Sequence, residues 1–180
     1  MTCPDFNGTS PFHLAIQESA THCLSEALRF LPKEILQIVD SQSRLPLISA
    51  VQLGNIEAVQ LLIEAGANVN SVDQVTGRTA LHFAVELAEQ SAGLVEMLIR
   101  NGCLLDVLDG DGLTPIHLAS IVDSKEPLTA IGKVVGGGEV LDLPDVQGLT
   151  PLMYACSYGR EENVKFLVKK KVHMQCTTYS

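Results

Sequence analysis

Five histidines and five cysteines are the residues of this sequence that could bind a metal or take part in acid–base or nucleophilic chemistry. The cysteines, at positions 3, 23, 103, 156 and 176, form no Cys-x-x-Cys pair of the kind that structural zinc or thioredoxin-type redox sites use. We expect Cys156 to be a buried, inert thiol, because no activating residues accompany it. Gly132-Lys133 is followed by Val134, whereas a phosphate-binding loop needs Ser or Thr there. The sequence therefore predicts reduced thiols, no metal, no cofactor and no catalysis.

Three of the histidines share one place in a repeated motif. His13, His82 and His117 are the sixth residues of three similar octapeptides, at residues 8–15, 77–84 and 112–119. A hydrogen bond to a neighbouring turn would satisfy each ring at such a recurring position. We therefore interpret these histidines as structural and not as metal ligands or acid–base groups.

The motif that carries these histidines recurs along the whole chain. Two weaker copies lie at residues 43–50 and 148–155, and the marker residues are Pro11, Pro46, Ala80, Pro115 and Pro151, spaced by 35, 34, 35 and 36 residues. In each copy Gly permits a turn, Thr or Ser can cap a helix, and Pro suits the first helical position. An Asp six or seven residues before each marker can close the turn with its own side chain. Each block is thus a predicted turn that begins a helix.

A second helix is predicted after each block. Ile56, Val59 and Leu62 show its apolar spacing of three or four residues, and Gly66, Gly102 and Gly136 stand where such helices commonly end. Neither helix of a pair is long enough to be stable alone. The pairs must therefore be stabilised by packing against one another.

The turn, the Thr-Pro-Leu-His-x-Ala helix, the Leu-rich helix and the segment Gly66-Ala67-Asn68-Val69-Asn70 together resemble the ankyrin repeat. The resemblance implies an all-α solenoid of five helix-turn-helix repeats, joined by β-turn or hairpin loops, in a single domain over residues 1–180. We expect the repeats at about 5–39, 40–72, 73–108, 109–144 and 145–172, with a tail at 173–180. Extra residues near 89–93 and after Gly136 predict lengthened loops, and the first repeat is irregular. Either the last helix is a C-terminal cap or the chain was cut from a longer protein.

The resemblance also implies where a partner binds. In such arrays the turn tips and the exposed side of the first helices form a concave face that meets another protein. The residues for which we predict contact are Leu53, Arg78, Glu86, Leu87, Asp111, Leu113, Ile121, Val122, Leu149 and Tyr158. The same face would include Phe6, Asn7, Gln17, Glu18, Gln42, Arg44, Gln52, Val146 and Gln147. Alternatively, the insertions in repeats three and four cover these side chains.

Charge and targeting signals indicate which partners and which cell compartment we expect for this protein. The net charge of −9 disfavours nucleic acid, and the acidic residues of the concave face favour a protein with a basic or apolar docking surface. A signal peptide and an uninterrupted apolar run of membrane-spanning length are both absent. We expect a monomeric cytoplasmic protein without membrane contact, also nuclear if Lys169-Lys170-Lys171 acts as an import signal.

Two functions remain open. The first is a non-catalytic adaptor or scaffold module in signalling, since the irregular later repeats look similar to inversin-type scaffolds. The alternative is an inhibitor that masks the basic surface of a transcription factor, because residues 77–86 look similar to a stretch of the IκB inhibitors. An enzyme would require a further domain downstream.

One modification is also predicted. Leu62 precedes Asn70 by eight residues, which resembles the spacing that asparagine hydroxylases use in ankyrin repeats. Asn68 replaces the usual acidic residue.

Overall fold

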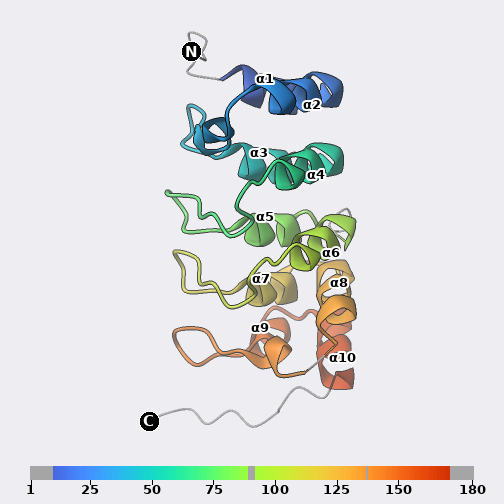
Figure 1. Cartoon of the computed structure of the whole chain (residues 1–180). Helices are drawn as coiled ribbons and strands as arrows, with labels where there is room; N and C mark the ends of the chain where they lie inside the picture. The colour runs from blue at the N-terminus through green and yellow to red at the C-terminus, as the bar shows by residue number, and fades with distance from the viewer. Residues whose placement is uncertain (1–9, 89–91, 137, 171–180) are drawn as a thin grey trace.

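The computed structural model describes residues 10–88, 92–136 and 138–170. Ten α-helices in these ranges form five consecutive pairs stacked in one direction, with loops projecting from one side (Figure 1). The first helices of the pairs are α1 (Pro11–Gln17), α3 (Pro46–Gln52), α5 (Ala80–Glu86), α7 (Pro115–Ile121) and α9 (Pro151–Ser157). The second helices are α2 (Thr21–Phe30), α4 (Ile56–Glu64), α6 (Ala92–Arg100), α8 (Glu126–Val135) and α10 (Glu161–Lys169). The predicted all-α solenoid of helix pairs is confirmed.

Several helices begin and end where the sequence predicted, although α6 begins at Ala92, inside the longer loop predicted near residues 89–93. Ser10 and Thr114 cap α1 and α7, because each side-chain oxygen accepts a hydrogen bond from the backbone N–H three residues later. Proline occupies the first turn of these helices, where no intrahelical N–H is needed. Gly66 and Gly102 follow α4 and α6 with φ angles of 99° and 85°, in the left-handed region that other residues rarely adopt.

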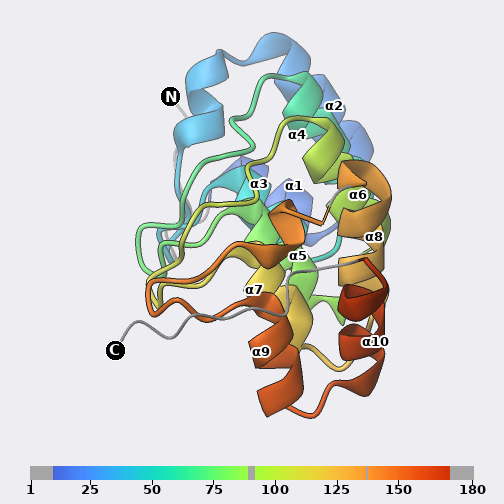
Figure 2. The same ribbon diagram turned by 90° about the horizontal axis from the view of Figure 1, so that it is seen from below.

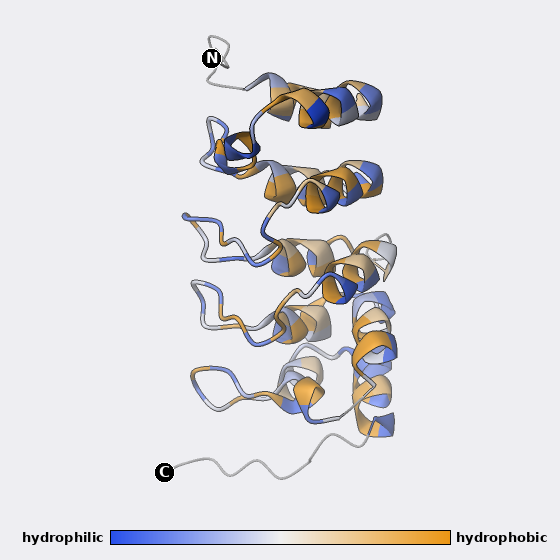
Figure 3. Ribbon diagram, in the orientation of Figure 1, coloured by the Kyte–Doolittle hydropathy of each residue, from blue (hydrophilic) through white to orange (hydrophobic). Residues whose placement is uncertain are grey.

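The core lies between two helical layers. The first helices stack on one another, as do the second helices, and each helix also packs against its partner in the same pair (Figures 1 and 2). Fully buried side chains of both layers meet there, among them Ile48, Leu81, Leu62, Leu98 and Leu128. Every helix carries both hydrophobic and hydrophilic residues, which suits an element that is buried on one side (Figure 3).

The departures from a regular repeat are filled by short 3₁₀ helices. After α2 the chain forms η1 (Lys33–Gln37), which buries Ile35 and Leu36. After α8 it forms η3 (Val140–Asp142), which buries Leu141. The predicted enlarged loop after Gly136 is therefore partly helical, because an apolar side chain there completes the core. Residues 89–91 of the predicted longer loop, and the predicted tail, lie outside the described residues.

Membrane insertion finds no support in the described ranges. Within them, each helix is too short or too polar to cross a bilayer.

Core packing between repeats generates a stability prediction. Leu81 is fully buried in α5, whereas Leu53, just after α3, is 54% exposed. We expect Leu81→Ala to lower the free energy of unfolding by about 2–5 kcal/mol, since a buried leucine leaves a cavity. Leu53→Ala, the same truncation at an exposed position, should change the urea midpoint little. Equal midpoints for the two variants would contradict the placement of Leu81 in the core.

Candidate protein-binding surface

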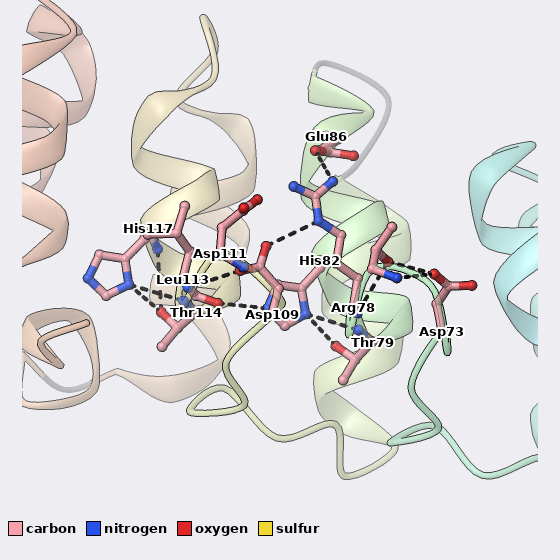
Figure 4. A network of polar contacts seen from close by, with 11 residues as sticks. Asp73, Arg78, Thr79, His82, Glu86, Asp109, Asp111, Leu113, Thr114 and His117 are labelled. Carbon is pink, nitrogen blue, oxygen red and sulfur yellow. Dashed lines mark hydrogen bonds and ion pairs between the residues drawn. The ribbon is translucent and has the colours of Figure 1, made fainter. Parts of the chain in front are cut away.

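The three repeated histidines connect successive repeats. His82 Nε2 lies 3.2 Å from the carbonyl oxygen of Leu113, and the Thr79 backbone N–H donates to His82 Nδ1 at 3.1 Å (Figure 4). His117 repeats the arrangement with the carbonyl of Leu149 at 3.0 Å. His13 Nε2 likewise lies 3.1 Å from the carbonyl oxygen of Arg44, but its Nδ1 lies 2.7 Å from the Ser10 hydroxyl oxygen. A carbonyl can only accept, so Nε2 carries the proton in each ring. The predicted structural role of these histidines is confirmed.

This arrangement requires neutral rings. Burial lowers the pKa of His13, His82 and His117, although nearby carboxylates and the carbonyl acceptors act in the opposite direction. All three side chains are fully buried, so a substrate cannot reach them. Among the described residues, no group of three or more His, Cys, Asp or Glu side chains is placed to hold a metal ion.

The cysteines differ in exposure. Burial raises the pKa of Cys103 to about 11, so its thiol stays protonated. The expectation that Cys156 is buried is wrong, because this residue is exposed on α9. Its counterparts Val51 and Val85 are buried inside the array, whereas Cys156 lies in the last described repeat.

The predicted turn aspartates hold the hairpin tips. Asp109 Oδ1 accepts hydrogen bonds from the backbone N–H groups of Asp111 and Leu113, both at 3.0 Å. Asp40 and Asp145 make the same two bonds in their own turns. Burial acts to raise the pKa of Asp40 and Asp145, but the hydrogen bonds that they accept outweigh it and lower both pKa values. The tips are therefore fixed by charge-assisted hydrogen bonds.

Two of the predicted contact residues are engaged within the protein. Arg78 Nε donates to the buried carboxylate of Asp109 at 3.1 Å, and Arg78 Nη1 pairs with Glu86 at 2.7 Å (Figure 4). Arg78 thus links the hairpins of repeats three and four. The Gly110 N–H also donates to the Thr76 carbonyl at 2.8 Å across the same junction. A partner would meet Arg78 and Glu86 as an ion pair and not as free charges.

The predicted contact residues differ in exposure. Leu53 and Tyr158 are more than half exposed, and Glu86 and Asp111 are also exposed. Leu87, Leu113, Ile121, Val122 and Leu149 are half-buried. The expectation of freely exposed aliphatics is wrong for Leu87 and Leu113, because both pack against the core. Phe6 and Asn7 lie outside the described residues, as do residues 89–91 and 137 of the insertions.

Sequence reasoning missed an apolar row on the hairpins. Val39, Val72 and Leu108 immediately precede turn aspartates, and each is about two-fifths exposed. Val75, near a hairpin tip, was also missed and is 75% exposed, whereas Val146, which the sequence did place on the concave face, is 64% exposed. Equivalent positions in stacked repeats form a row along the array. The sequence does contain a signal for this row, namely an apolar residue immediately before the turn aspartate in successive repeats, outside the predicted helices.

Tyr158 is held by its neighbours. Its ring stacks on Tyr154 at 6.5 Å between centroids, and Tyr154 Oη donates to Asp145 at 2.8 Å. Burial and the Asp145 carboxylate raise the pKa of Tyr154 to about 12, so this hydroxyl remains a donor. An exposed aromatic ring on a fixed support is the kind of residue that dominates interface energy.

Asn70 links repeats two and three. Its Nδ2 donates to the Gly102 carbonyl at 3.0 Å, and its Oδ1 accepts from the Leu104 N–H at 2.8 Å. The side chain is half-buried, so a hydroxylase would have to displace both bonds.

The comparisons with known proteins agree with this geometry. A family model described as ankyrin repeats matches the chain in three copies, over residues 1–73, 46–103 and 81–178. The chain is 35% identical over 118 residues to the nuclear factor NF-kappa-B p105 subunit of Gallus gallus, and 32% identical over 130 residues to inversin of Canis lupus familiaris. These stretches cover 64% and 72% of this chain but 12% of either relative.

A solved structure has the same fold. The ankyrin repeat domain of Bcl-3, a unique member of the IkappaB protein family, matches with a TM-score of 0.85 and 25% sequence identity. The match covers 97% of this chain and 77% of the Bcl-3 chain.

The buried histidines generate a pH prediction. Because their folded pKa values lie below the ordinary value of about 6.5, the unfolded chain binds more protons as the pH falls below that value. We expect the urea midpoint to fall from neutral pH towards about pH 5, and His117→Gln to make this dependence less steep. The same substitution at exposed His22 is the matched control for the loss of one histidine. A midpoint independent of pH over this range would contradict the prediction.

Hydroxylation of Asn70 remains a proposal. We expect the peptide that contains Asn70, isolated from cells, to carry one additional oxygen atom, while Asn101-containing peptides do not. Intact mass spectrometry with fragment assignment makes the comparison. An unmodified Asn70 in cells with active asparagine hydroxylases would remove the proposal.

Proposed function

The chain belongs to the ankyrin-repeat family, and we propose that it is a non-catalytic adaptor or scaffold module that binds a partner protein through its concave face. The observation that carries the proposal is a set of exposed apolar side chains on hydrogen-bonded supports. Leu53 and Tyr158 lie at the ends of first helices, and Val72 and Leu108 lie on the hairpins. Pre-organised anchors of this kind lose little conformational entropy on binding.

The partner that fits this face has a basic and apolar surface. Glu86 and Asp111 are exposed beside the apolar residues, and Arg78 is already neutralised by Asp109 and Glu86. An acidic rim favours association with basic partners and disfavours nucleic acid. We propose a monomeric module without cofactor or membrane contact, acting in the cytoplasm and also in the nucleus.

A second candidate is an inhibitor that masks the basic surface of a transcription factor. The likeness to the p105 subunit and to the Bcl-3 domain supports it. Inversin, a relative of comparable identity, supports the scaffold instead. The two functions share the concave face and differ in the partner.

A pair of matched triple variants tests the concave face. Leu53→Asp/Leu108→Asp/Tyr158→Asp changes exposed apolar residues of that face, and Phe30→Asp/Ile56→Asp/Val168→Asp changes exposed apolar residues at the second helices. We expect proteins captured from cell lysate by the wild-type chain to be lost with the first variant and retained with the second. Quantitative mass spectrometry measures the retention, and circular dichroism checks both folds.

The outcomes separate the two candidates. A retained DNA-binding factor that is released by its own cognate DNA would favour the inhibitor, and a partner insensitive to DNA would favour the scaffold. Equal retention by both triple variants would contradict binding through the concave face.

A further inference from the structure

A basic groove lies between α8 and α10. These two helices stand on the side of the molecule away from the hairpins (Figures 1 and 2). The volume of the groove is about 660 Å³. The groove is lined by Lys125, Thr129, Glu162, Lys165, Phe166, Lys169 and Lys170. It shares no residue with the concave face.

The groove arises from an irregularity in the outer layer of helices. α8 packs closely on α6 but meets α10 at far fewer places. The contact with α10 depends on Gly132, because a Cβ there would lie 2.6 Å from Phe166 Cζ. Lys170 Nζ bonds to the Gly132 carbonyl at 3.1 Å and lies 5.8 Å from the centre of the Phe166 ring. The two helices therefore touch at Gly132 and Phe166, and the groove lined by lysines and Phe166 lies beside this contact.

The charge of this groove opposes that of the whole chain. Four of the chain's 12 Lys and Arg residues line it, although the net charge of the protein is −9. The carboxylates beside them are Glu162, which lines the groove, and Glu161, which lies 3.9 Å from Lys165 Nζ. Repulsion among clustered lysines that lack enough counter-charges favours binding of an anionic group.

The side chain of Glu162 shows how lysines of the groove can bind a carboxylate. Lys125 of repeat four lies 3.3 Å from one oxygen of Glu162, and Lys165 of α10 lies 2.8 Å from the other. Lys169 follows Lys165 by one helical turn on the same helix, and its ammonium group makes no ion pair or hydrogen bond with any described residue. A second carboxylate arriving one turn further along α10 would therefore find an unpaired ammonium group.

We propose that the α8–α10 groove binds an acidic segment of a partner protein, with carboxylates on Lys165 and Lys169 and an apolar side chain on Phe166. A peptide suits the site better than a nucleic acid does, because the basic strip is confined to one groove of an acidic molecule that repels a long polyanion. This site is independent of the proposed function of the concave face. It would allow two proteins to be bound at once on opposite sides of the array.

A labelled peptide tests the groove with the full chain. The probe is a fluorescein-labelled peptide with one leucine flanked by Glu and Asp, and the reference probe has Gln and Asn in their place. Binding is measured by fluorescence anisotropy at about 0.15 M salt, which screens nonspecific electrostatic attraction. We expect saturable binding of the acidic probe, weakened about tenfold by Lys165→Glu/Lys169→Glu. Replacing the leucine of the probe with serine should also weaken binding.

The matched control is Arg29→Glu/Lys33→Glu, which makes the same change in net charge at exposed residues of the first repeat. It should bind the acidic probe as the wild type does, and so should the concave-face triple variant. Carbodiimide coupling followed by mass spectrometry should join the probe to lysines of the groove.

Three results would overturn the proposal. The first is an equal loss of binding in the groove variant and the charge-matched control, and the second is the absence of saturable binding. The third is equal affinity for a single-stranded oligonucleotide of the same charge. Circular dichroism and urea midpoints show whether the variants remain folded, so a loss of binding is not mistaken for unfolding.

Discussion

No helix in the described part of the chain is long enough to be stable alone, so the packing of each repeat on the next is the constraint on which the rest of the structure depends. The first helices have seven residues each, and the second helices have nine or ten. Burial of side chains such as Leu81 and Ile116 between repeats supplies the missing stabilisation. The hydrogen bonds of His13, His82 and His117 also orient successive repeats, because each joins the start of one helix to the next hairpin. They thereby fix the register between repeats.

The histidine hydrogen bond is absent where the motif changes. In repeat two, Ile48 and Leu45 replace the histidine and the capping hydroxyl, so apolar packing alone acts at that position. In repeat five, Met153 takes the place of the histidine, and the Thr150 hydroxyl is buried without a hydrogen-bond partner among the described residues. Asn70 compensates between repeats two and three by bonding across the junction. The repeats are thus linked by different means along the array.

The same hydrogen bonds that order the array also shape its surface. Asp109 is a turn-closing residue, and it is also the buried acceptor that holds Arg78 beside Glu86. The charge of the concave face is therefore set partly by residues that a partner cannot touch. On the opposite side, the looser contact between α8 and α10 leaves lysines that are only partly neutralised. The exposed acidic residue Glu86 of the concave face and the basic groove lie on different layers of helices.

Much of the fold followed from local chemistry in the sequence. Local signals mark each repeat: the period of the motif, the capping residues, Pro46 or Pro115 at a first helical position, and Gly66 after a second helix. Each capping or turn residue affects only residues close to it in the sequence. Their consequences could therefore be predicted without a structure. The bridging role of His82 and His117 was predictable for the same reason, since their recurrence implied a partner one repeat away.

The exposure of individual side chains was decided by the tertiary structure. Leu87 and Leu113 look like surface residues in the repeat pattern but pack on the core, whereas Cys156 is exposed because it lies in the last described repeat. Val72 and Leu108 are exposed although they are apolar. The sequence by itself determined the period of the repeat and most helix ends, because these depend on near neighbours. Only the stacked structure decided which side chains reach the solvent and which charges are paired. Both depend on contacts between residues of different repeats, more than thirty positions apart in the sequence.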